Sequence, residues 1–137
     1  MSYWMEQIDQ HFSIPAEGRQ AAFDALRGWE RRQMERYPQF AELRRRPLGN
    51  AKSLKDTLCE LSWEVEMDNS GAICEMYFEG DRLGDEDEWL DEIAPYVAVG
   101  SYLTMRGEDG FCWRWYFDGS HCTTYEGKLV FPDMPND

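Results

Sequence analysis

The sequence has few of the residues on which metal sites and His-dependent catalysis rely. It contains two histidines, His11 and His121, and four cysteines without a C-x-x-C pair: Cys59, Cys74, Cys112 and Cys122. Structural zinc sites and disulfide frameworks normally show closer cysteine spacing, so this pattern argues against both. A two-residue turn at Asp118-Gly119 would pair Cys122 with Trp115 and Cys112 with Tyr125, which places the two sulfurs on opposite faces. We expect buried free thiols and no cofactor or metal.

Long apolar runs and the common catalytic motifs are also missing. No stretch approaches the roughly 20 apolar residues that cross a bilayer, and residues 1–6 do not begin a secretory signal. The chain has no G-x-S-x-G, Walker A, G-x-G-x-x-G or H-E-x-x-H motif. These absences predict a cytoplasmic protein that does not contact membranes and is not an enzyme.

Positive charge is scarce in most of the chain. Residues 1–60 hold nine acids and ten bases, so residues 61–137 hold 27 − 9 = 18 acids and 14 − 10 = 4 bases, a net charge of −14. Phosphate binding needs the opposite sign, which argues against direct nucleic-acid binding. A basic protein surface, including one that itself binds nucleic acid, is the natural partner. The alternative is that the charge only keeps the domain soluble.

Aromatic residues are abundant, with 6 Trp, 7 Tyr and 7 Phe. Each can bury about 150–250 Å², so the 137 residues can form one substantial core, and we expect a single domain over 1–137. Hydrophobic periodicity predicts helices over 16–36, over 54–60 with Ser53 as N-cap, and from Gly84–Glu88 to Pro95. It predicts strands over 10–15, 61–67, 72–79, 101–106, 111–117 and 121–125.

The remaining segments are an irregular connection over 37–52, which contains the Arg44–Arg46 triplet, and a frayed tail over 132–137. The order of the elements predicts an α+β fold. It would be a ferredoxin-like (split βαβ) antiparallel sheet with helices on one face and an appended C-terminal β-hairpin.

Two surfaces are candidates for binding a partner. The first is the acidic run that opens the third helix, in which Asp85 is a natural N-cap; the run lacks the spacing of a calcium loop. The second is the outer face of strand 111–117, because Phe111, Trp113, Trp115 and Phe117 alternate toward the core. Arg114 and Tyr116 on that outer face suit a cation–π cluster with Tyr102 or Tyr125. The candidate partner-binding residues are Asp85, Glu86, Asp87, Glu88, Asp91, Glu92, Glu108, Asp109, Arg114 and Tyr116.

Segment 100–119, with its Gly-Ser-Tyr and Gly-Glu-Asp-Gly-Phe-Cys-Trp-Arg-Trp-Tyr-Phe-Asp-Gly motifs, resembles a loose group of small acidic proteins. Segments 80–85 and 93–97 are similar to it too. The group is encoded by bacteria, their phages and mobile elements, and the resemblance covers about residues 61–119. It implies a mobile-element setting in a bacterial host cell, where small acidic proteins such as anti-CRISPR proteins block defence nucleases.

The leading hypothesis is therefore a non-catalytic inhibitor of the anti-CRISPR type, a monomer or homodimer. It would occupy the basic, nucleic-acid-binding surface of a bacterial defence complex. One alternative is an immunity protein or antitoxin that neutralises a nuclease toxin. Another is a small metal-dependent enzyme that uses the carboxylates of 85–91.

Overall fold

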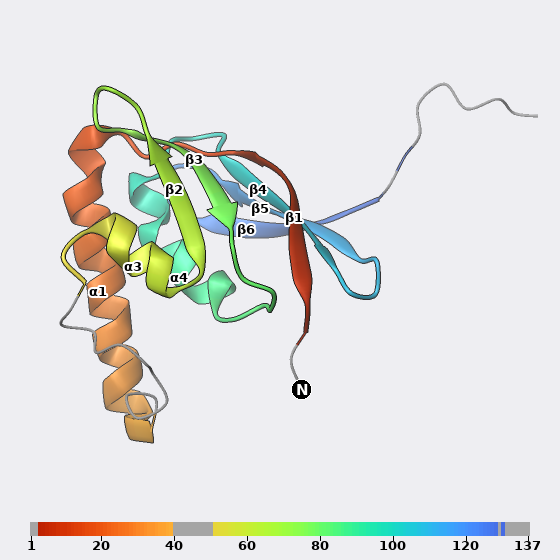
Figure 1. The fold of residues 1–137 in the computed structure, drawn as a ribbon, viewed down its shortest axis with the longest axis horizontal. Coiled ribbons are helices and arrows are strands. Elements are labelled where there is room, and N and C mark those ends of the chain that lie inside the picture. The colour runs from red at the N-terminus through yellow and green to blue at the C-terminus, as the bar shows by residue number, and fades with distance from the viewer. Residues whose placement is uncertain (1–2, 40–50, 129, 131–137) are drawn as a thin grey trace, which may run out of the picture.

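The computed structural model describes residues 3–39, 51–128 and 130, which adopt an α+β fold (Figure 1). The Arg44–Arg46 triplet and the tail over 132–137 lie outside the described residues. The α-helices are α1 (Arg19–Arg36), α3 (Leu54–Glu60) and α4 (Glu86–Ile93), with the 3-10 turns η1 (Ala16–Gly18) before α1 and η3 (Ala94–Tyr96) after α4. The strands are β1 (Met5–His11), β2 (Trp63–Met67), β3 (Ile73–Phe78), β4 (Tyr102–Gly107), β5 (Cys112–Phe117) and β6 (Cys122–Gly127).

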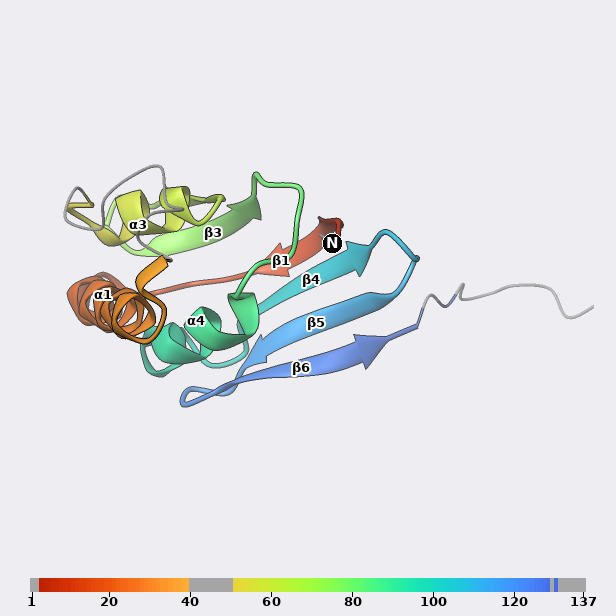
Figure 2. The same cartoon turned by 90° about the horizontal axis from the view of Figure 1, so that it is seen from below.

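The strands form a four-stranded antiparallel sheet in the order β1-β4-β5-β6 and a separate β2–β3 hairpin. Figure 2 shows β1, β4, β5 and β6 side by side, with β3 and α3 beyond β1 and with α1 and α4 on one flank. The expected α+β class and the hairpin appended after β4 are therefore confirmed. The single continuous sheet is not, because hydrogen-bonded strand pairing stops between β1 and β3.

Two glutamines of β1 fill the gap between β1 and β3. Gln7 donates from Nε2 to the carbonyl of Met76 at 2.9 Å and accepts the N–H of Phe78 at 2.9 Å. Gln10 accepts the N–H of Met76 at 3.2 Å. Backbone bridges close both ends of the gap, at Ile14–Ile73 and at Trp4–Arg82. Side-chain amides thus replace part of a strand ladder, and we call this junction the glutamine seam.

The glutamine seam explains why the first strand was placed wrongly. We expected it over 10–15, but it spans Met5–His11. Its register shifts between Gln7 and Asp9, and Ile8 at the shift is exposed. The bulge and the inward-facing glutamines remove the alternation of apolar and polar residues that identifies a strand in sequence.

Tryptophans dominate the core, which lies between the sheet, the β2–β3 hairpin and the helices. The ring of Trp63 on β2 contacts those of Trp89 on α4 and Trp115 on β5, with centroids 6.2 and 6.3 Å apart. All three side chains are buried. The expected alternation on β5 is confirmed for Trp113, Trp115 and Phe117, whereas Phe111 is exposed before the strand begins. The tryptophans therefore join the two sheets into one core.

The β5–β6 connection is longer than the predicted two-residue turn. Phe117 pairs with Cys122 and Cys112 pairs with Gly127, so residues 118–121 form the loop. The Asp118 carboxylate stabilises this loop by accepting the N–H groups of residues 120 and 121. The register therefore differs from the predicted one by two residues, which leaves each side chain on its predicted face.

The cysteines are free, as expected, but they are not buried. Cys59 and Cys74 are exposed, and Cys112 and Cys122 are half-buried. They lie on short amphipathic elements whose core-facing positions are taken by larger residues. Burial and nearby carboxylates raise the pKa of Cys122 to about 12, so this thiol stays protonated at neutral pH.

Candidate functional site

Helix α4 forms because its apolar residues fall on one stripe and its acids suit the N-terminal end of a helix dipole. Trp89, Leu90 and Ile93 are buried, and the first turn holds three carboxylates. Asp85 occupies the expected N-cap position, but its side chain makes no capping hydrogen bond. The acids of the first turn therefore compensate the free N–H groups by charge rather than by a side-chain cap.

Neutral donors hold two carboxylates of α4 in place. Asp87 accepts the indole N–H of Trp115 at 2.8 Å and lies 3.4 Å from the hydroxyl of Thr124. Asp91 accepts the backbone N–H of Cys122 at 2.9 Å. These bonds tie α4 to β5 and β6 and fix the direction of both carboxylates. Because the donors are uncharged, they leave the negative charge of each carboxylate in place.

The other carboxylates of this surface contact side chains of α1 or crowd against one another. Glu88 lies 3.4 Å from Nε2 of Gln33. Glu92 forms an ion pair with Arg32 at 2.5 Å, with both side chains partly exposed. Burial and repulsion from Glu88 raise the pKa of Asp85, which is the direction expected where carboxylates crowd together.

Glu86 was expected on the partner-binding surface but is buried, with 3% of its surface exposed. It accepts the indole N–H of Trp63 at 3.1 Å and the N–H of Gly84 at 2.6 Å. Burial raises its pKa, while these hydrogen bonds act in the opposite direction. Glu86 therefore supports the core and cannot contact a partner directly.

We call the remaining exposed or half-buried carboxylates the α4 acidic surface: Asp85, Asp87, Glu88, Asp91 and Glu92. The arginines of the acidic C-terminal part pair elsewhere. Arg106 bonds Glu6, Arg114 lies over the ring of Tyr102, and Arg82 lies over the ring of Trp4. Among the described residues, Arg32 forms an ion pair with Glu92 of this surface and His121 lies 3.5 Å from Asp91. No described Lys or Arg pairs with Asp85, Asp87 or Glu88.

The second candidate, the outer face of the sheet, has the expected cation–π geometry. The guanidinium carbon of Arg114 lies 4.0 Å from the ring centroid of Tyr102, and Nε donates to Thr104 at 2.8 Å. The ring of Tyr116 meets that of Tyr125 edge-on at 6.2 Å. Arg114 and Tyr116 thus belong to an ordered face that also carries negative charge, since Asp9 lies 4.0 Å from Arg114.

The structure does not bring Glu108 and Asp109 to the α4 acidic surface. They lie in the β4–β5 turn, at the end of β5 away from the residues that contact α4 (Figure 1). Asp109 accepts the hydroxyl of Tyr3 at 2.5 Å. This bond raises the pKa of Tyr3 to about 12 and lowers that of Asp109. Glu108 accepts the N–H of Trp4 at 3.2 Å, so both acids anchor the N-terminal segment.

The carboxylates and histidines that a metal-dependent enzyme would use contact different parts of the structure. Within 3–39 and 51–128, no three His, Cys, Asp or Glu side chains gather in a group that could hold a metal ion. His121 lies 3.5 Å from Asp91 through Nδ1, and His11 lies against the ring of Tyr102 at 5.7 Å. One concave space, of about 430 Å³, is lined partly by the Arg106–Glu6 pair.

Sequence reasoning missed the residues that hold the candidate surfaces in place. Thr124 and the indole N–H of Trp115 both approach Asp87, but they lie 37 and 28 residues away from it in sequence. A sequence indicates that a buried Trp needs an acceptor without indicating which carboxylate supplies it. The exposed Trp4 and Ile8 on the β1 side were also missed, because single exposed apolar residues carry no periodic signal.

A comparison with known proteins found no matching family model, no matching curated protein and no matching solved structure. Across the described part of the chain, every helix is too short or too polar to span a bilayer.

Proposed function

We propose that the protein is a non-catalytic binding protein that occupies a basic surface on another macromolecule through the α4 acidic surface. One observation carries this proposal: Asp87 and Asp91 are fixed by neutral donors, so their carboxylates are ordered without a Lys or Arg ion pair among the described residues. An ordered charged surface loses little side-chain entropy on binding. It also attracts a basic partner over a distance set by salt, about 8 Å at physiological ionic strength.

The proposed partner is a basic protein that itself binds nucleic acid, such as an effector or nuclease of a bacterial defence complex. The charge of −14 over residues 61–137 supports a basic partner. The resemblance of segment 100–119 to small acidic phage and mobile-element proteins supports an inhibitor of the anti-CRISPR type that acts in the bacterial cytoplasm. In this role the protein competes with nucleic acid for the same surface.

The proposal extends to the fold. If the glutamine seam counts as strand pairing, the strands run in the order β2-β3-β1-β4-β5-β6, and the first four of these are arranged as in a ferredoxin-like sheet. On this basis we propose a ferredoxin-like topology, with β5 and β6 as the appended hairpin. Among the described strands, β1 and β3 would then be joined by the glutamine side chains together with the two backbone bridges.

The test uses a variant that removes charge from the α4 acidic surface without touching the bonds of Asp87 and Asp91. Asp85→Asn, Glu88→Gln and Glu92→Gln remove three negative charges and keep an amide oxygen that can still accept the long bond from Gln33 at Glu88 and the bond from Arg32 at Glu92. The matched control, Glu17→Gln, Asp24→Asn and Glu66→Gln, removes the same charge from exposed positions on η1, α1 and β2. A partner is captured from bacterial lysate with the parent protein and purified.

Association rates of the partner with all three proteins are then measured at low and high salt. We expect the α4 variant to associate on the order of tenfold more slowly at low salt, because electrostatic steering is lost. The control should match the parent, and added DNA should compete with binding. Equal rates for the α4 variant and the control would refute the α4 acidic surface as the interface. The outer face with Arg114 and Tyr116 would then be the surface to vary.

A further inference from the structure

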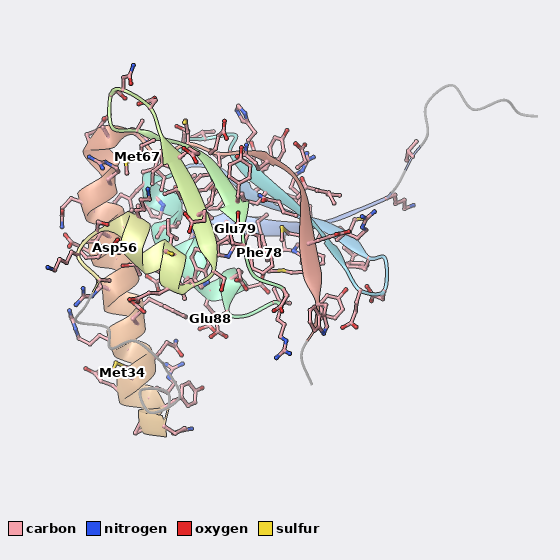
Figure 3. All side chains as sticks on the ribbon, in the orientation of Figure 1. Met34, Asp56, Met67, Phe78, Glu79 and Glu88 are labelled. Carbon is pink, nitrogen blue, oxygen red and sulfur yellow. The ribbon has the colours of Figure 1, made fainter. Side chains whose placement is uncertain are left out.

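A cavity at the opposite end of α1 from its contacts with α4 has an unusual charge for this acidic protein. It measures about 190 Å³ and opens between the first turns of α1, the start of α3 and the end of the β2–β3 hairpin. Figure 3 labels Met67, which lies at this end of β2 beside α1. The polar residues that line the cavity include three cations: Arg19, Lys52 and Lys55.

Arg19 lies half-buried against this cavity with its donors poorly satisfied. Its Nε atom is buried and has no hydrogen-bond partner among the described residues. One of its terminal nitrogens lies 3.3 Å from the thioether sulfur of Met67, which is a weak acceptor. The other terminal nitrogen of Arg19 lies beside Gly71, whose φ is +87°. A Cβ atom at position 71 would be 3.3 Å from this nitrogen, so glycine leaves room for the guanidinium group. A buried guanidinium donor without an acceptor is costly in a folded protein.

No carboxylate of the described residues forms an ion pair with Arg19, Lys52 or Lys55. The nearby acids have other roles: Asp24 accepts a bond from Gln20, and Asp56 accepts the backbone N–H of Lys52. By contrast, Arg32, Arg82, Arg106 and Arg114 each lie within 4.0 Å of an acid. In a chain with 27 acids and 14 bases, three cations line one cavity and pair with no carboxylate of the described residues, which suits the binding of an anion.

The rest of the cavity wall is apolar, formed mainly by Phe23, Leu54, Met67 and Ile73. A cavity of about 150 Å³ is large enough to hold a benzene ring. The space here therefore suits a ring-sized apolar group beside an anionic one. Ligand sites in proteins commonly combine such apolar walls with a few polar groups that fix the orientation.

We propose that this cavity binds a small anion that carries an apolar group, such as an aromatic carboxylate or an aromatic phosphate ester. Arg19 pairs with the anionic group, Lys52 and Lys55 add attraction at the mouth, and Phe23 and Leu54 contact the apolar part. The site shares no residue with the α4 acidic surface. Its test is therefore independent of the test of the proposed function.

The test is a titration of the full-length protein with benzoate, phenyl phosphate and inorganic phosphate at low salt. Backbone amide NMR signals of Ser53 and Gly71 report binding at the cavity. We expect benzoate or phenyl phosphate to shift these signals at millimolar or lower concentration and to bind more tightly than inorganic phosphate. Arg19→Gln should weaken binding about tenfold, because it removes the charge-assisted pair. Arg31→Gln, an equal change of charge on the exposed face of the same helix, should leave the affinity unchanged.

A second variant, Lys55→Gln, changes an exposed side chain and should weaken binding about two- to threefold. It keeps the test valid if Arg19→Gln does not fold. Absence of shifts with all three ligands would overturn the proposal. Equal affinities for the parent and Arg19→Gln, or for the parent and Lys55→Gln where Arg19→Gln does not fold, would also overturn it. Equal affinities for inorganic phosphate and the aromatic ligands would show that the apolar wall does not take part.

Discussion

Replacing Gln7 by leucine tests whether the glutamine seam joins the two sheets. The side chain makes two hydrogen bonds of 2.9 Å with the backbone of β3. Leucine has nearly the same size but no polar atoms, so the carbonyl of Met76 and the N–H of Phe78 would lose their partners. A buried backbone group left without a partner costs about 1–3 kcal/mol. Since the seam is partly buried, we expect Gln7→Leu to lower the free energy of unfolding by about 2–4 kcal/mol.

Replacing Gln7 by glutamate tests the hydrogen bond that its side chain donates separately from the one that it accepts. A carboxyl group at this position can still accept the N–H of Phe78, but its ionised form places a second acceptor against the carbonyl of Met76. Only the protonated acid can donate there, so the folded state should raise the pKa of the introduced carboxyl group above its ordinary value of about 4.3. The folded state then binds the proton more tightly than the unfolded state. The variant should therefore be most stable at low pH and should lose stability relative to the parent as pH rises.

Urea unfolding at several pH values measures both effects, and amide hydrogen exchange at Phe78 reports the seam itself. Gln20→Leu is the control, because Gln20 is exposed and its side chain donates to Asp24, one turn away on the same helix; we expect a change below about 0.5 kcal/mol. If Gln7→Leu costs no more than this control and the Phe78 amide exchanges as slowly as in the parent, the seam does not hold the sheets together.

Two further predictions concern residues near the start of β2 and α4. Because burial raises the pKa of Glu86, the folded state holds this proton more tightly, and stability from this group is lost as pH rises above 4.5, the ordinary value. The free energy of unfolding of Glu86→Gln minus that of the parent should thus increase from acidic to neutral pH, and a flat difference would contradict it. Ser62 has φ +74°, so Ser62→Gly should raise stability by about 0.5–1 kcal/mol, measured by thermal unfolding; a lower melting temperature would contradict this.

The elements that could be predicted from the sequence are those with a clear period or cap. Helix α3 begins after Ser53, whose hydroxyl accepts the N–H of Asp56 as expected. Helix α1 and strand β5 follow from their apolar stripes. Strand β1 could not be placed, because its inward-facing Gln7 and Gln10 are stabilised by a strand more than sixty residues away. Local patterns carry no information about such partners.

For the candidate surfaces too, local features could be predicted from the sequence, whereas contacts between distant residues could not. The acidic run of α4 is local, so the exposed carboxylates were expected, but the burial of Glu86 depends on Trp63, which is distant in sequence. The cavity around Arg19 was missed for a similar reason. Arg19 is separated from Lys52 and Lys55 by more than thirty residues. From the sequence, Phe23 and Ile73, which also line the cavity, are predicted only as core residues.

The bond between Asp91 and the N–H of Cys122 also constrains how the protein can change over generations. Among the described strands, β6 is at the edge of the four-stranded sheet, and an unpaired edge can recruit another strand and start aggregation. The Asp91 carboxylate accepts the N–H of Cys122, which is one of the backbone donors on that edge. A lineage that adapts to a new partner by replacing Asp91 would therefore also expose part of the edge, whereas Glu88 and Glu92 can vary without that consequence. Adaptation of this surface should be concentrated at the latter two positions.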